Sequence, residues 1–229
     1  MKINNMFQIL FGLFFLLNCK DDKKETLPTE IQNEISNAKS IEKDSLKLLE
    51  KPTFKPYLAN CLKIEDALIN DHKIILEKKI FDELYPKRDS VRTEIWECGN
   101  PFNWLDDKWM TKTYGKYDQN RDTFGDFNGK LTSIFTKSVQ FDTNNHIVLF
   151  NSALSKGNNF KIKSHQIVLN ENTTLEEFQK FFPNLKKEEL EHKNECRFRM
   201  GLEKDSDDAF LFYFENGKLK SFNLWWLLC

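Results

Sequence analysis

A β-hairpin signal near the end of the chain restricts its fold more than any other feature. Residues 209–215 (AFLFYFE) are almost entirely apolar, and residues 218–228 (KLKSFNLWWLL) are largely apolar. Between them stands Asn216-Gly217, the preferred two-residue hairpin turn because both residue types tolerate positive φ. Just upstream, residues 196–202 alternate apolar side chains with charged or small ones, the period of a half-buried strand. The pattern therefore predicts a three-stranded antiparallel meander.

Earlier parts of the chain add further strands and at least one helix. Strand patterns occur over residues 91–98, 131–141, 146–154 and 160–169. Residues 57–85 fit a helix, or a strand followed by a helix. Thr173 and Glu176 match a capping box, which predicts a helix from Thr173 to Phe182 that stops at Pro183. The expected fold class is α+β: an antiparallel sheet of hairpins with one or two packed helices.

The N-terminal segment has the order of a secretory signal. Lys2 precedes an apolar run over residues 6–17, which is too short to span a bilayer, since spanning takes about 20 apolar residues. The run ends in Leu16-Leu17-Asn18-Cys19, which resembles a bacterial lipobox in the looser form used by Bacteroidota. This resemblance implies that residues 1–18 are a signal peptide and that the Cys19 thiolate receives a diacylglycerol and becomes the mature N-terminus. The membrane is then the first expected partner.

The residues after Cys19 carry a second resemblance. Lys20, Asp21 and Asp22 are similar to the signal that sends Bacteroidota lipoproteins to the cell surface. It implies an outer-membrane protein whose domain faces outward. The alternative is a domain that faces the periplasm, with these charges as a plain linker.

Three regions follow from this organisation. Residues 1–18 are the expected signal peptide, residues 19–55 a lipid-anchored polar tether, and residues 56–229 a single α+β domain. Within the tether, apolar residues recur at spacings of three and four between Ile31 and Leu49, which predicts an amphipathic helix.

The net charge of the chain argues against nucleic acid as a partner, and its cysteine content allows disulfide bonds. The chain has 34 basic and 35 acidic side chains, and such a balance offers no basic field for nucleic acid. Besides Cys19, four cysteines remain, an even number in a compartment that permits disulfides. Proximity in the sequence favours Cys61–Cys98 and leaves Cys196–Cys229; buried free thiols are the alternative.

The segment from Gly99 to Gly129 is irregular and rich in aromatic and polar side chains. Aromatic rings beside hydrogen-bonding groups suit recognition of a sugar or of a protein surface. The expected binding surface consists of Trp104, Asp106, Trp109 and Tyr117. The structural alternative is that these aromatics only anchor a long loop.

Two acidic stretches are candidates for cation binding. Asp118, Asn120 and Asp122 begin like an EF-hand loop, which points to calcium. The match then fails, since Thr123 stands where the loop needs glycine and Gly129 where it needs glutamate; a polar turn is the alternative. The second stretch, residues 203–208 (EKDSDD), is expected to be a solvent-exposed hairpin loop.

Motifs for catalysis are not found in the sequence. The four histidines are scattered without zinc-ligand spacing, and neither a nucleophile elbow nor a phosphate loop occurs. No catalytic residue and no cofactor other than calcium is therefore predicted. The expected function is a non-catalytic binding module for an envelope or extracellular protein or glycan. The alternatives are a glycan-directed hydrolase, whose carboxylates meet only in the fold, and an inhibitor or immunity-type lipoprotein.

Overall fold

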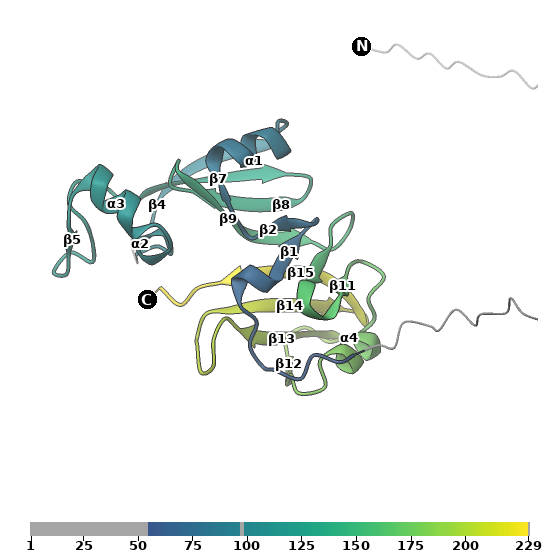
Figure 1. The fold of residues 1–229 in the computed structure, drawn as a ribbon. Helices are drawn as coiled ribbons and strands as arrows, with labels where there is room; N and C mark the ends of the chain where they lie inside the picture. The colour runs from purple at the N-terminus through teal and green to yellow at the C-terminus, as the bar shows by residue number, and fades with distance from the viewer. Residues whose placement is uncertain (1–54, 97–98, 229) are drawn as a thin grey trace, which may run out of the picture. The chain divides into compact units, whose positions relative to one another are not determined.

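Figure 1 presents the computed structural model of the protein, which describes residues 55–96 and 99–228. Residues 53–229 form one unit. Within it, the described residues form antiparallel sheets accompanied by four α-helices. The predicted α+β class is confirmed, with more helices than expected. None of the helices among these residues is long and apolar enough to cross a membrane.

The largest sheet has nine strands, and eight of them form one continuous path. In spatial order these are β12 (Lys187–Glu189), β13 (Glu195–Gly201), β14 (Ala209–Glu215), β15 (Lys218–Trp225), β9 (Ile147–Leu154), β8 (Val139–Thr143), β7 (Lys130–Thr136) and β4 (Ser90–Ile95). The ninth, β3 (Ile75–Glu77), pairs with β9 off this path. Strand β15 pairs with β14 on one side and with β9 on the other, so it joins the two halves of the sheet.

Smaller elements complete the described part of the chain. The second sheet contains β11 (Ile167–Leu169), β10 (Phe160–Ile162), β1 (Ala67–Ile69) and β2 (His72–Lys73), and a separate hairpin contains β5 (Tyr117–Asp118) and β6 (Thr123–Phe124). The α-helices are α1 (Lys78–Leu84), α2 (Phe102–Leu105), α3 (Asp107–Tyr114) and α4 (Leu175–Phe181), and 3-10 turns span Ile64–Asp66 and Lys163–His165.

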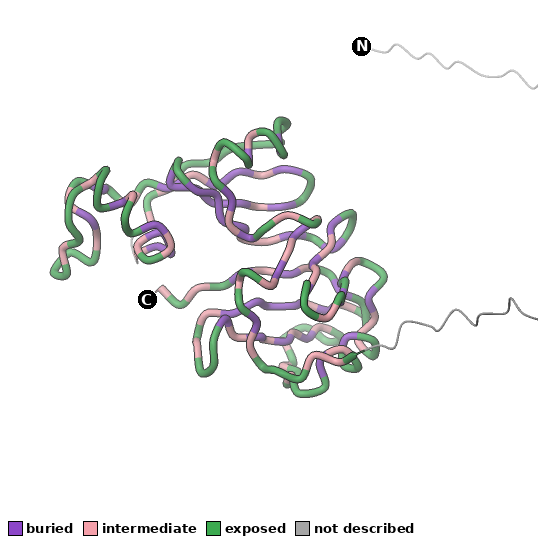
Figure 2. The backbone as a smooth tube through the Cα atoms, viewed as in Figure 1, coloured by how far each residue is buried: buried purple, intermediate pink, exposed green. Residues whose placement is uncertain are grey.

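Phenylalanine rings form the centre of the core. Phe160 of β10 is fully buried and lies 5.1 Å, between ring centroids, from both Phe210 and Phe212 of β14. Phe178 of α4 lies 4.7 Å from Phe198 of β13 in the same measure. The small sheet and α4 therefore cover the large sheet through aromatic contacts, and Figure 2 shows buried residues concentrated along the strands.

The predicted C-terminal meander is confirmed. Strands β13, β14 and β15 pair in sequence, and Asn216 and Gly217 both have positive φ in the turn between the last two. The helix near Thr173 is also present, although its cap differs from the prediction. Thr174 is the N-cap and accepts from the Glu177 N–H at 3.1 Å, whereas the Thr173 hydroxyl accepts from Asn170 N–H instead.

Two predicted strands are wrong in extent. The segment 131–141 is a hairpin and not one strand, because Lys137 and Ser138 form a turn with φ of 50° and 62°. Lysine and serine rarely adopt such left-handed values, so the sequence carries no turn signal there. The segment 160–169 is likewise divided, since the turn at Lys163–His165 separates β10 from β11.

The cysteines that the structure describes are not cross-linked. Cys61 is half-buried, Cys196 is buried, and both are free thiols. Their expected partners, Cys98 and Cys229, lie outside the described residues. Cys61 and Cys196 therefore belong to neither of the predicted disulfides.

Candidate functional site

A cleft of about 600 Å³ lies where the segment before β1, helix α2, the β13–β14 loop and the residues after β15 meet. Its lining consists of Lys63, Ile64, Glu65, Trp104, Leu105, Leu202, Glu203, Ser206, Asp208 and Trp226. These residues come from four separate parts of the chain, so only the folded sheet brings them together. The cleft combines aromatic, aliphatic and carboxylate groups, a mixture typical of small-molecule sites.

Two tryptophans form the aromatic part of the cleft. Trp104 of α2 and Trp226, just after β15, meet edge to face with ring centroids 5.6 Å apart and planes at 69°. Trp226 packs against the hydrophobic core, whereas Trp104 is 50% exposed. The Trp104 indole is therefore held on one side and accessible on the other, as a stacking platform must be.

Carboxylates form the polar part of the cleft. Glu65, Glu203 and Asp208 line it together with a single cation, Lys63. The Asp208 Oδ1 atom accepts the backbone N–H of Leu227 at 2.8 Å, which ties the residues after β15 to the β13–β14 loop and fixes Trp226. An excess of acceptors over donors suits ligands that carry hydroxyl or amino groups, and it disfavours anionic ones.

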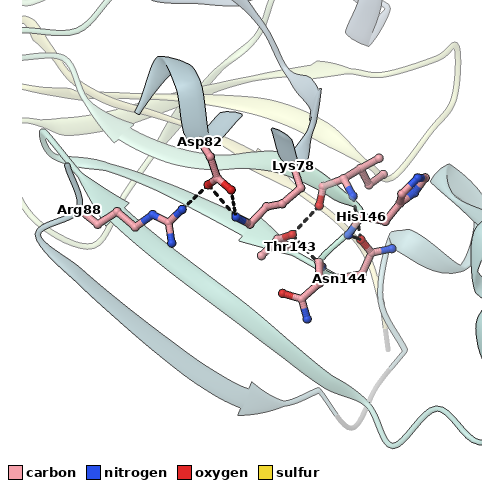
Figure 3. A network of polar contacts seen from close by, with 8 residues as sticks. Lys78, Asp82, Arg88, Thr143, Asn144 and His146 are labelled. Atoms are coloured by element: carbon pink, nitrogen blue, oxygen red, sulfur yellow. Dashed lines mark hydrogen bonds and ion pairs between the residues drawn. The ribbon is translucent and has the colours of Figure 1, made fainter. Parts of the chain in front are cut away.

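Asp106 lies at the junction of α2 and α3 and is buried. Its Oδ2 atom accepts from the Asn144 amide and from Nδ1–H of His146, each at 2.8 Å. Asn144 in turn accepts the backbone N–H groups of His146 and Ile147 through its side-chain oxygen, both at 3.0 Å. Asn144 and His146, both labelled in Figure 3, lie in the turn between β8 and β9. Asp106 thus anchors the helix corner that carries Trp104.

Trp109 belongs to the anchor and not to the cleft. Its indole stacks on the His146 imidazole, with ring centroids 4.9 Å apart and planes 2° from parallel. The expected binding surface of Trp104, Asp106, Trp109 and Tyr117 is therefore distributed over three places. Trp104 lines the cleft, Asp106 and Trp109 hold the helix corner, and Tyr117 lies in the β5–β6 hairpin with its hydroxyl on Asp122.

The carboxylates among the expected calcium ligands make local contacts. Asp118 accepts the backbone N–H of Asn120 at 2.9 Å and lies 3.4 Å from the Arg121 guanidinium, while Asp122 accepts from Tyr117. No cluster of three or more His, Cys, Asp or Glu side chains suited to a metal occurs in residues 55–96 and 99–228. The interpretation of this loop as a polar turn accounts for its contacts.

The predicted lipid and export sites lie outside the described residues, namely Cys19, Lys20, Asp21 and Asp22. Two parts of the cleft were not predicted from the sequence. The sequence predicts only a strand at Trp226. The 203–208 loop is largely exposed, as predicted, and it also supplies Glu203, Ser206 and Asp208 to the cleft, which the sequence does not predict. The signal that existed was the pair Trp225-Trp226 at the end of a strand, next to an acidic hairpin loop.

Comparison of the chain with known protein families, with curated proteins and with solved structures found no match.

Proposed function

We propose that this protein is a lipid-anchored, non-catalytic binding module of the cell envelope that takes a carbohydrate chain in the cleft lined by Trp104 and Trp226. The observation that carries the proposal is the half-exposed Trp104 indole, held against Trp226 at the mouth of a cleft lined with carboxylates. A sugar ring offers an apolar face for such an indole and hydroxyl donors for the acids around it.

Charge narrows the class of glycan. Three carboxylates face one lysine in the lining, and like charges repel most strongly where water is partly excluded. The expected ligands are neutral or amino sugars, whereas uronic acids and phosphorylated glycans are disfavoured. Raising the salt concentration is expected to weaken the preference for amino sugars, since salt screens the attraction.

Calorimetric titration with soluble oligosaccharides tests this proposal. Neutral, amino and uronic-acid oligosaccharides are titrated into the purified full chain, and we expect the Trp104→Ala variant to bind about tenfold more weakly, since aromatic contacts contribute about 0.5–1.5 kcal/mol beyond buried area. The matched control is Trp225→Ala, because Trp225 is exposed, adjacent to Trp226 and absent from the cleft lining. Equal affinity of wild type and Trp104→Ala for the bound sugar would contradict the proposal.

The same cleft makes glycan hydrolysis the second candidate function. Glycoside hydrolysis uses a pair of carboxylic acids on either side of the bond, and Glu65, Glu203 and Asp208 all line the cleft. Turnover of a polysaccharide that disappears in Glu203→Gln or in Asp208→Asn, with binding retained, would replace the binding proposal by this one. A tight one-to-one complex with a protein, and no affinity for sugars, would instead indicate the inhibitor class.

The proposed location rests on Cys19 and on the charged residues that follow it. We expect the wild-type protein to incorporate a labelled fatty acid and to lie in the membrane fraction, and the Cys19→Ser variant to incorporate none, because the serine hydroxyl does not replace the thiolate that carries the acyl chains. Treatment of intact cells with a non-penetrating protease then distinguishes a domain outside the cell, which is degraded, from one that faces the periplasm. Replacing Lys20, Asp21 and Asp22 by alanine is expected to protect the domain from that protease.

A further inference from the structure

Strand β4 ends the large sheet and has an unprotected edge. Among the described residues it pairs with β7 alone, and Figure 1 shows it next to β7. It is six residues long, SVRTEI, and every residue except Glu94 is exposed. We propose that this edge binds the β4 strand of a second copy of the chain, in antiparallel register about Thr93, to form a symmetric dimer with a continuous sheet.

The contrast with the opposite edge of the sheet supports this interpretation. Edge strands are commonly kept from pairing by short length, charge, proline or bulges. Strand β12 follows that rule, since it is only Lys187–Glu189 with the sequence KEE. Strand β4 is twice as long and has no proline, and its two charged residues, Arg92 and Glu94, form an ion pair with each other. It exposes Val91 and Ile95 at 52% and 67%, so the other face of this edge is largely apolar.

The hydrogen-bond pattern decides which residues face the partner. The Trp96 N–H donates to Gly129 O at 2.8 Å, and this pair continues the register in which Glu94 lies opposite Leu131. Hydrogen-bonded pairs alternate along an antiparallel ladder, so even-numbered residues of β4 direct their backbone groups to β7. Val91, Thr93 and Ile95 therefore direct theirs outward, toward the free edge.

Charge selects a single register. A symmetric pairing of the outward groups can be centred on Arg92, Thr93 or Glu94. Centres at Arg92 and at Glu94 place two like charges directly opposite each other, which is destabilising. The centre at Thr93 places Arg92 opposite Glu94 of the other copy, twice, and it pairs Val91 with Ile95 on the opposite face. Only this register makes every cross-strand pair favourable.

Cysteine cross-linking in the full chain tests the register. Directly opposite residues in a hydrogen-bonded pair have Cα atoms about 5.5 Å apart, within the range of a disulfide. We therefore expect mild oxidation to link Thr93→Cys chains into dimers. The matched control is Val91→Cys, whose counterpart lies four residues along the other strand, about 13 Å away; a mixture of Val91→Cys and Ile95→Cys chains should link again.

Charge exchange gives an independent measurement. In Arg92→Glu chains, two unlike pairs become like pairs, and we expect the dimer to dissociate about tenfold more readily, since each pair contributes about 0.2–1 kcal/mol. The double variant Arg92→Glu/Glu94→Arg restores both unlike pairs and should recover the wild-type dissociation constant in sedimentation equilibrium. These substitutions lie outside the cleft lining, so sugar binding is expected to stay unchanged.

Three results would overturn the proposal. Equal cross-linking of Thr93→Cys and Val91→Cys would show random collision, and stronger cross-linking of Arg92→Cys would show a different register. A Thr93→Cys chain that stays monomeric and resists a maleimide reagent would assign the edge to residues 1–54 of the same chain. Absence of sugar binding, with cross-linking as expected, would contradict the proposed sugar site and leave the proposed dimer unaffected.

Discussion

The Trp109 indole lies parallel to the His146 imidazole, with ring centroids 4.9 Å apart. The same imidazole bonds through Nδ1 to Asp106, which lies between α2 and α3. His146, in the turn between β8 and β9, is thus held in two ways from the α2–α3 corner. Trp109 stacks on the face of its ring, and Asp106 accepts from its Nδ1 atom. The corner that carries Trp104 is thereby fixed to the large sheet, so the anchor and the proposed sugar platform are parts of one arrangement.

Removing the anchor carboxylate is expected to loosen this corner. Asp106→Ala leaves the Asn144 amide and the His146 ring without their acceptor, and an unpaired buried polar group costs about 1–3 kcal/mol in free energy of unfolding. Urea denaturation measures the loss. The control Asp107→Ala removes an exposed carboxylate in the first turn of α3, which contributes only about 0.3–1 kcal/mol. Equal losses in both variants would show that Asp106 anchors nothing.

Truncating the central ring of the core is expected to destabilise the whole domain. Phe160 is fully buried and contacts Phe210, Phe212 and Phe222, so Phe160→Ala should lower the free energy of unfolding by about 3–5 kcal/mol. Leu154→Ala is the control, because that side chain is 49% exposed and surface changes stay within about 0.5 kcal/mol. A small effect of Phe160→Ala in thermal or urea denaturation would mean that the small sheet does not cover the large one.

Stability should depend on pH through one buried acid. Burial raises the pKa of Asp142 above its ordinary value of 3.8, although hydrogen bonds from Ser133, Asn151 and Gln140 oppose the shift. The folded state then holds this proton more tightly than the unfolded state. The stabilisation of the folded state that comes from this raised pKa is therefore fully present below pH 3.8. It is lost as the pH rises through the raised pKa of the folded state.

The comparison with Asp142→Asn isolates that contribution. We expect the free energy of unfolding of the variant, relative to wild type, to increase with pH across this window, by at most about 1.4 kcal/mol per pH unit. Denaturation at a series of pH values measures it. A difference that falls with pH would mean that the hydrogen bonds outweigh burial.

Substitutions at Thr174 test whether its hydroxyl caps the N-terminus of α4. Thr174 accepts from the Glu177 N–H, and loss of an N-cap costs about 1 kcal/mol. Thr174→Ala should therefore lower the thermal midpoint, whereas Thr174→Ser keeps the oxygen and should leave it nearly unchanged. Equal midpoints for the alanine and serine variants would remove the cap assignment.

The turns that residues adjacent in the sequence determine could be predicted, and the turn between β14 and β15 is an example. Asn216-Gly217 marks its turn because both residue types adopt positive φ with little cost. Lys137 and Ser138 adopt the same left-handed region, but tertiary pairing of β7 with β8 imposes it against their preference. The residue types at positions 137 and 138 do not indicate a turn, so the sequence predicts one strand over residues 131–141 where the structure has β7 and β8.

The cleft could not be predicted, because it is lined by residues that lie far apart in the sequence. Trp104 could be identified as a candidate because it lies in an irregular, aromatic segment. Its partner Trp226 is at the other end of the domain in sequence, and only the pairing of β15 with β9 and β14 brings it near. Spacing along the chain carries no information about such a meeting, so the contribution of the exposed loop 203–208 to the cleft could not be predicted either.

The position of β15 has a consequence for how the protein is made. Among residues 55–96 and 99–228, the two halves of the large sheet join only through Lys218–Trp225. The barrier to folding therefore includes closing long stretches of chain, and domains dominated by such non-local pairing fold in roughly milliseconds to seconds. Until that strand has been synthesised, the edges of β9 and β14 that it covers are open. Newly made chains are thus prone to aggregate through these edges until β15 is in place.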